Sequence, residues 1–227
     1  MRFSGLLTKM ETQYGTPIQY YLHLGEDVID MNQLLGNKIR VKFDYCQCIE
    51  CGKKKEIFAM GFCKNCYFTS PHAGGWIVRP ELSTAHLGKA DRDLEVEALA
   101  QLQPHIVYLA NSGGLKVGVT RLSQLPTRWI DQGAEYTIRL AETENRYQAG
   151  LIEVALKQHM ADKTNYRKML KENVPYSDLV EKKDEMLSFV PQDLSCYIEQ
   201  DNQVLHLEYP IREYPSKVNS VTPVSYT

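Results

Sequence analysis

Four cysteines in two closely spaced pairs constrain the fold of this chain more than any other feature of its sequence. In "CQCIECGKKKEIFAMGFCKNC", eleven residues separate Cys48-x2-Cys51 from Cys63-x2-Cys66. Each C-x2-C turn points both sulfurs inward, and a hairpin between the pairs brings four thiolates around one tetrahedral ion. Such a ribbon folds only with its metal, because its own core is too small. We therefore expect a structural zinc ribbon over residues 46–70, with Zn²⁺ held by Cys48, Cys51, Cys63 and Cys66.

Three alternatives stay open for this segment. Cys46 is a fifth thiol that could exchange with Cys48, although alternation places the two along one strand edge rather than in a knuckle. Thiolates alone also suit an iron–sulfur cluster, or the cysteines could be free and buried. The lysines at 53–55 could touch phosphate, but a basic loop tip is more often only solvated.

Composition limits the class of protein and its surroundings. The 227 residues are 43% hydrophobic and 24% charged, enough for one compact domain or two small ones. A net charge of -2 excludes wholesale coating of nucleic acid but permits a local basic groove. Five of the six cysteines lie between positions 46 and 66, which is metal spacing and suits a reducing compartment. With neither a signal peptide nor a membrane-spanning run in the sequence, we expect a cytoplasmic protein.

The periodicity of apolar residues predicts an α+β protein. Alternation in "IQYYLHLG" and "NKIRVKFDY" predicts an antiparallel β unit over residues 1–45. Residues 71–103 begin as an irregular loop and end as a helix from about Asp91. The tail from 196 to 227 again predicts strands, which could pair with the N-terminal β unit because chain ends often meet.

Two further helices are predicted after position 140. One runs through 143–161, capped by Thr143 and with Arg146 exposed, and a charged one runs through 176–190. The expected organisation is an N-terminal β unit, a zinc ribbon, a linker with a helix, a small antiparallel sheet flanked by helices, and a C-terminal helix with strands. These parts span 1–45, 46–70, 71–103, 104–170 and 171–227.

The segment "HIVYLANSGGLKVGVT" predicts a β-hairpin, because two short β-branched runs flank a glycine turn. Loop length decides which side chains share a face. A two-residue turn would pair Ala110 with Leu115, whereas a loop of residues 112–114 places Tyr108 and Lys116 on the same face. Gly118 would then leave room there for the backbone of a ligand to approach.

The residues around this hairpin resemble the GIY-YIG endonuclease superfamily over residues 104–170. "IVY" with Tyr108 is similar to the first tripeptide of that superfamily, and "KVG" at 116–118 to a lysine-bearing form of the second. Arg128 in "PTRW" matches its arginine, Glu153 in "GLIEVALK" its metal-binding glutamate, and Asn165 in "DKTNY" its trailing asparagine. The wider chain, through the ribbon, "HLGKADRDLE" and "TRWIDQGA", also resembles an uncharacterised bacterial family known only as a domain of unknown function.

The GIY-YIG resemblance implies phosphodiester hydrolysis of DNA or RNA with one divalent cation. It implies that Glu153 holds Mg²⁺, that Tyr108 orients or deprotonates the attacking water, and that Arg128 neutralises charge on the phosphorane. Lys116 would assist as a point charge and Asn165 would position by hydrogen bonds. The sequence departs from the superfamily at Lys116, where a second tyrosine is usual, so the base network is altered.

Each candidate residue also has a purely structural interpretation. Tyr108 could be a half-buried strand aromatic, and Glu153 could lie on a solvated helix stripe. Arg121 and Arg128 could be surface ion-pair partners of Asp131 and Glu135. Trp129, Asp131 and Gln132 could line a nucleic-acid groove beside Arg128, or Trp129 could close the core. The sequence therefore favours a nuclease-like enzyme, with an inactive nucleic-acid-binding module or a protein-interaction scaffold as alternatives.

Overall fold

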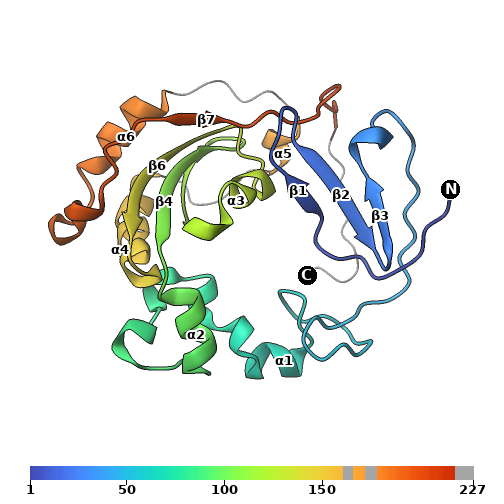
Figure 1. Cartoon of the computed structure of the whole chain (residues 1–227), viewed down its shortest axis with the longest axis horizontal. Helices are drawn as coiled ribbons and strands as arrows, with labels where there is room; N and C mark the ends of the chain where they lie inside the picture. The colour runs from blue at the N-terminus through green and yellow to red at the C-terminus, as the bar shows by residue number, and fades with distance from the viewer. Residues whose placement is uncertain (161–165, 172–177, 218–227) are drawn as a thin grey trace.

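The computed structural model describes residues 1–160, 166–171 and 178–217, and it confirms an α+β fold with two antiparallel sheets (Figure 1). One sheet has the order β1-β2-β3 and the other β5-β4-β6-β7. The strands are β1 Glu11–Gln13, β2 Gln19–Leu24, β3 Asp27–Asp30, β4 His105–Asn111, β5 Leu115–Arg121, β6 Tyr136–Thr143 and β7 Val204–His206. The helices are α1 Lys64–Thr69, α2 Leu94–Gln101, α3 Thr127–Asp131, α4 Arg146–Lys157, α5 Tyr166–Met169 and α6 Leu179–Leu187.

The β4–β5 hairpin has the longer of the two loops that the sequence allows. Asn111 pairs with Leu115, so residues 112–114 form the loop and Tyr108 lies opposite Gly118. Successive side chains of a strand point to opposite faces. Tyr108 and Lys116 therefore share one face of the sheet, as the three-residue loop predicts.

We expected Gly118 to leave room for a ligand, but the structure shows that it does not. A Cβ atom built there would lie 2.7 Å from the Tyr108 hydroxyl oxygen and 2.8 Å from its Cζ. The missing side chain thus makes room for the Tyr108 ring of the neighbouring strand. The expectation was wrong because cross-strand partners on one face compete for the same volume.

The two faces of the four-stranded sheet pack against different partners. One face buries Val107, Leu109 and Val117 against helices α4 and α6. The opposite face buries Ile106 and Tyr108 against α3, together with residues of the N-terminal sheet and the C-terminal tail. Figure 1 shows α4 and α6 on one side of this sheet and α3 with β1–β3 on the other.

Two of the predicted helix starts are displaced by a few residues. Helix α4 is capped by Asn145, whose side chain accepts a hydrogen bond from the amide of Gln148, whereas Thr143 still belongs to β6. Helix α2 is capped by Asp93 rather than starting near Asp91. In both cases an Asx residue closer to the apolar repeat provides the cap.

The chain ends differ from the predicted β unit. Residues 37–45 form no strand, and the tail contributes β7, which pairs with β6 in the four-stranded sheet. The N-terminal sheet and the tail instead meet through the amide of Ile18, which donates to the carbonyl of Glu208 at 2.9 Å. Both segments alternate as strands do, but alternation does not identify the pairing partner.

Among the described residues, the longest apolar helix falls short of the length and hydropathy that crossing a membrane requires.

The close fit of Tyr108 over Gly118 gives a first prediction. Gly118→Ala should lower the free energy of unfolding by about 1–3 kcal/mol, because the added methyl group overpacks a buried ring. Urea denaturation in the presence of the ribbon metal measures the change. Gly15→Ala is the matched control, since its Cβ would only reach ordinary contact at 3.4 Å. Equal stability of the two variants would contradict this packing.

Candidate functional site

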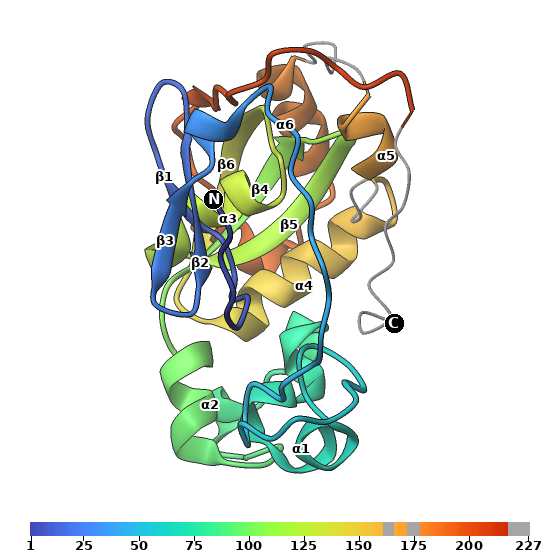
Figure 2. The same ribbon diagram turned by 90° about the vertical axis from the view of Figure 1, so that its right-hand side faces the viewer.

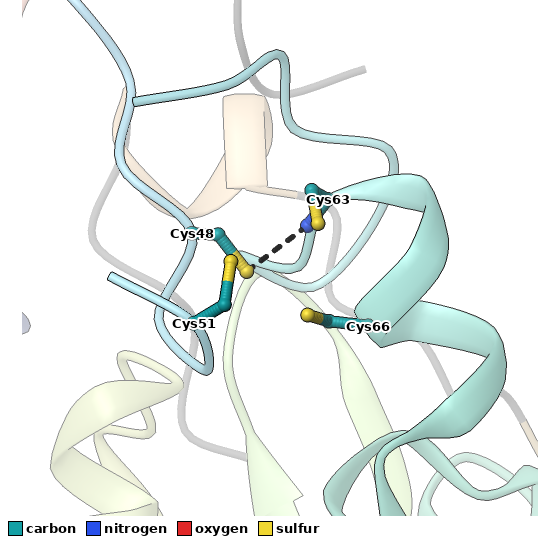
Figure 3. A group of neighbouring side chains, drawn as sticks. All are labelled: Cys48, Cys51, Cys63 and Cys66. Atoms are coloured by element: carbon teal, nitrogen blue, oxygen red, sulfur yellow. Dashed lines mark hydrogen bonds between the residues drawn. The ribbon is translucent and has the colours of Figure 1, made fainter. Parts of the chain in front are cut away.

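Four cysteines converge at one point of the ribbon. The sulfurs of Cys48, Cys51, Cys63 and Cys66 all lie within 4.8 Å of one another. Figure 3 shows the side chains turned toward a common centre, two from the first knuckle and two from the segment that opens α1. Cys48 Sγ accepts a hydrogen bond from the amide of Cys63 at 3.3 Å. This is the arrangement that the two C-x2-C pairs predict, and it can hold a metal ion.

Local backbone geometry explains why the second pair reaches the first. Met60 and Gly61 both have positive φ, and Ala59 pairs with Phe62 across the turn that they make. The chain therefore reverses just before Cys63, which serves as the N-cap of α1. Cys66, on the first turn of α1, then points back toward Cys48.

The thiol chemistry of the cluster suits a cation. Burial, followed by the neighbouring cysteine sulfurs, raises the pKa of Cys66 to about 12. Cys48 is also buried, but backbone N–H donors bring its pKa down to about 6. A group of thiols that resist ionising together becomes fully ionised when a divalent ion compensates the charge. Cys46 is not a member of the group among the described residues.

The Tyr108 side chain is completely buried beneath α3. Its hydroxyl donates to Gln132 Oε1 at 2.7 Å, and its ring meets Trp129 edge-on at 5.8 Å between centroids. Burial raises the pKa of Tyr108 to about 12, although Arg128 and Gln132 oppose the rise. Tyr108 thus contacts α3, and its hydroxyl stays protonated at neutral pH.

Lys116 is also buried, beside the charge of Arg128. Burial, and then the Arg128 guanidinium, lower the pKa of Lys116 to about 8. Arg128 itself is exposed at the start of α3. Among the residues expected to act together, Arg128 therefore provides the solvent-exposed charge.

Glu153 lies on the inner face of α4 rather than on a solvated stripe. Its side chain is buried, and Oε2 lies 3.2 Å from the Lys157 ammonium one turn along the helix. Its charge acts on both Tyr108 and Arg146. The carboxylate is therefore near enough for its charge to act on both groups, and because it is buried, the stripe interpretation is wrong.

Arg146 is a member of this cluster that the sequence analysis placed on the surface. It is partly buried, and its guanidinium donates to the carbonyls of Trp76 and Ile77 at 3.1 and 2.7 Å. Burial lowers the pKa of Arg146 to about 10, with Glu153 opposing and Arg121 and Arg128 adding to the shift. The signal was available, because positions 146 and 153 are two turns apart and share one helix face.

His105 adds a further buried group that the sequence analysis did not single out. Burial lowers the pKa of His105 to about 4, and the charges of Arg146 and Arg121 contribute. Its Nδ1 lies 2.7 Å from the carbonyl of Gln103. Arg121 pairs with His105 across β4 and β5. We call Arg121, Arg128, Arg146 and Lys116 the cationic group, and Arg121 lies at its edge.

The remaining expected residues have separate positions. Trp129 is buried in the apolar cluster under α3, so it closes the core and cannot stack on a base in this structure. Asp131 pairs with Lys9 and lines a cavity of about 830 Å³ whose lining includes none of Tyr108, Lys116, Arg128 and Glu153. Asn165 lies outside the described residues.

The cysteine cluster generates the second prediction. Cys63→Ser should remove one bound metal ion per chain, because it deletes one of four converging sulfurs. Mass spectrometry of bound metal and titration of reactive thiols measure the loss. Cys46→Ser and Cys196→Ser are matched controls that should keep the ion. Loss of metal from Cys46→Ser would show that the ligand set is wrong.

Comparison with known families gives one assignment. Residues 36–226 match a family described as a protein of unknown function (DUF2797). No curated protein and no solved structure matches the chain. The matched range contains the cysteine cluster and every residue of the cationic group, and it includes most of the chain. The chain therefore belongs to the DUF2797 family.

Proposed function

We propose that this protein is a metal-assisted, nuclease-like enzyme acting on nucleic-acid phosphodiesters, with a structural Zn²⁺ in the ribbon. The observation that carries the proposal is the crowding of positive charge around one buried carboxylate. Burial and then Arg128 lower the pKa of Lys116. Burial also lowers the pKa of Arg146, where Glu153 opposes the shift and Arg121 and Arg128 add to it. Cations that depress one another's pKa values favour an anion between them, and a phosphate supplies that charge.

Each charged group has a task that its position supports. Arg128, exposed and permanently charged, would bind a non-bridging phosphate oxygen and stabilise the charge that develops there. Arg146, fixed by two carbonyls, would hold a second oxygen. Glu153 already pairs with the cationic Lys157, so its carboxylate suits a divalent ion. When bound at Glu153, Mg²⁺ would supply positive charge to the phosphate as a Lewis acid.

Proton transfer is assigned to Lys116 rather than to Tyr108. A phenol with a pKa of about 12 remains protonated, and its hydroxyl is engaged by Gln132, so Tyr108 acts as a positioning residue for α3. Lys116, with a pKa of about 8, is neutral in part near physiological pH and can accept the proton of the attacking water. In the sequence resemblance to the GIY-YIG superfamily, Lys116 stands where a second tyrosine is usual, and in this proposal the lysine would take the place of that tyrosine.

A second candidate function rests on how closed this cluster is. Tyr108, Lys116 and Glu153 are each less than a tenth exposed. A protein that binds phosphate through Arg128 without admitting water to Glu153 would be a nucleic-acid-binding module with no cleavage activity. A scaffold that only binds proteins would need neither Arg128 nor Glu153.

Substitution of the carboxylate separates cleavage from binding. Glu153→Gln should reduce Mg²⁺-dependent cleavage of labelled DNA and RNA by at least about a hundredfold, because it removes the charge that holds the cation. Binding measured at low salt should persist. Glu185→Gln, an exposed carboxylate on α6, is the control and should leave the rate unchanged. Cleavage that survives Glu153→Gln would disprove the proposed mechanism.

The pH dependence of the rate tests the base. Because the pKa of Lys116 in the folded protein is lowered to about 8, the neutral form gains population as pH rises through that value, and the rate should rise with it. Lys116→Arg keeps the charge but cannot lose its proton, so it should abolish this rise and lower the rate at pH 8.5 by at least about a hundredfold. Full activity of Lys116→Arg would show that position 116 acts only as a point charge.

A further inference from the structure

We propose that the exposed segment 36–45 and the lysines at 53–55 of the ribbon form a binding surface for single-stranded nucleic acid. This surface is separate from the cationic group. This inference rests on the function proposed above and deepens it, because it says where the chain of the substrate lies outside the reacting phosphate. In the following text, residues 36–45 are called the strap.

The strap is unusually exposed for an ordered part of the chain. Every residue from 36 to 45 is exposed, and Val41 keeps 85% of its surface. From 38 to 45, no main-chain amide or carbonyl takes part in a hydrogen bond with any described residue. Apolar side chains and free main-chain groups in water favour a partner that covers them.

The strap alternates two kinds of side chain along its length. From 38 to 43, Lys38, Arg40 and Lys42 occupy the even positions, and Ile39, Val41 and Phe43 the odd ones, while Asp44 is the one acidic residue of the even series. In an extended chain, alternate residues point to opposite sides. One side of the strap is therefore basic and the other is apolar, which suits a ligand with a charged backbone and flat, apolar bases.

A cleft of about 340 Å³ lies where the strap meets the ribbon. Its lining combines Phe43 and Tyr45 of the strap with Lys54, Lys55, Glu56 and Ile57 of the ribbon, next to Cys46. The Lys54 ammonium lies 3.6 Å from the centroid of the Tyr45 ring. Aromatic rings beside lysines are the usual means of binding a base by its face and its phosphate by charge. The Glu56 carboxylate can accept a hydrogen bond from an exocyclic amino group of the base.

The positive charge of the chain is concentrated in residues 36–70, which favours a negatively charged ligand such as single-stranded nucleic acid there. Residues 36–70 contain seven Lys and Arg but three Asp and Glu, although the whole chain has a net charge of -2. Four thiolates with one divalent ion contribute a charge of about −2, which leaves the segment positive. The rest of the chain is acidic, so a polyanion is directed to the strap and the ribbon.

A single strand fits these features better than a duplex or a protein. Paired bases hide their faces, so Phe43 and Tyr45 could not stack on them. Figure 2 shows the strap running from the three-stranded sheet to the ribbon, across the front of β5 and α4 in this view. A flexible strand bound along this course can follow both parts.

The test uses the full chain with its metal and the Glu153→Gln substitution, which prevents cleavage. A fluorescein-labelled deoxythymidine oligomer of about 20 nucleotides is the probe, and anisotropy is measured over a range of KCl concentrations. Lys38→Ala/Arg40→Ala/Lys42→Ala should weaken binding at least about tenfold and reduce the slope against log salt by about 2, because three phosphate contacts are lost. Phe43→Ala should weaken binding about tenfold with no change of slope.

Controls and outcomes follow from the same chain. Lys89→Ala/Lys182→Ala removes the exposed Lys89 and the partly exposed Lys182, both away from the strap and the ribbon, and should bind as the parent does. Parent-like binding by the strap variants, or no binding by the parent, overturns the inference. So does light scattering that shows a dimer which Phe43→Ala dissociates, because a second copy then covers the strap. If the strap variants lose binding but the unsubstituted protein shows no Mg²⁺-dependent cleavage, the proposed enzyme activity is contradicted and the binding surface is still supported.

Discussion

The register of the β4–β5 hairpin is the constraint on which the rest of the structure depends. A three-residue loop sets Tyr108 opposite Gly118, and this choice assigns every side chain of both strands to a face. Val107 and Val117 then contact the side that holds α4, while Tyr108 contacts α3. A shift by one residue would place the phenol among the apolar side chains of α4 and α6 and remove it from Gln132.

The cysteine cluster and the cationic group each bring several groups of like charge close together, negative in the first and positive in the second. In the ribbon, four thiols share a small volume, and they can ionise together only around a cation. Beside the four-stranded sheet, Arg128 acts on the Lys116 ammonium, and Arg121 and Arg128 act on the Arg146 guanidinium, so these positive charges disfavour one another. Four converging thiols favour a cation, and positive charges that repel one another favour an anion, and this pair of preferences is the physical basis of the proposed function.

The sequence predicts correctly the features that depend only on residues close together along the chain. The cysteine knuckles, the hairpin and the α+β class follow from spacing, turn residues and periodicity, and the structure confirms them. Features that depend on distant partners were missed. Gly118 makes room for Tyr108 across the strands, Arg146 is held by carbonyls about 70 residues earlier, and the tail pairs with β6. No local pattern carries that information, because pairing and burial are set by the whole fold.

Part of what buries Tyr108 lies outside the region that matches the family. The match begins at residue 36, so β1–β3 precede it. Yet Ile18, fully buried just before β2, belongs to the same apolar cluster as Tyr108 and Trp129. The N-terminal sheet thus helps to cover the face of β4 that holds the phenol, and its only described backbone hydrogen bond to the tail is that of Ile18. Side-chain packing of Ile18 and Tyr20, rather than backbone pairing, therefore provides most of the contact between this sheet and the Tyr108 face.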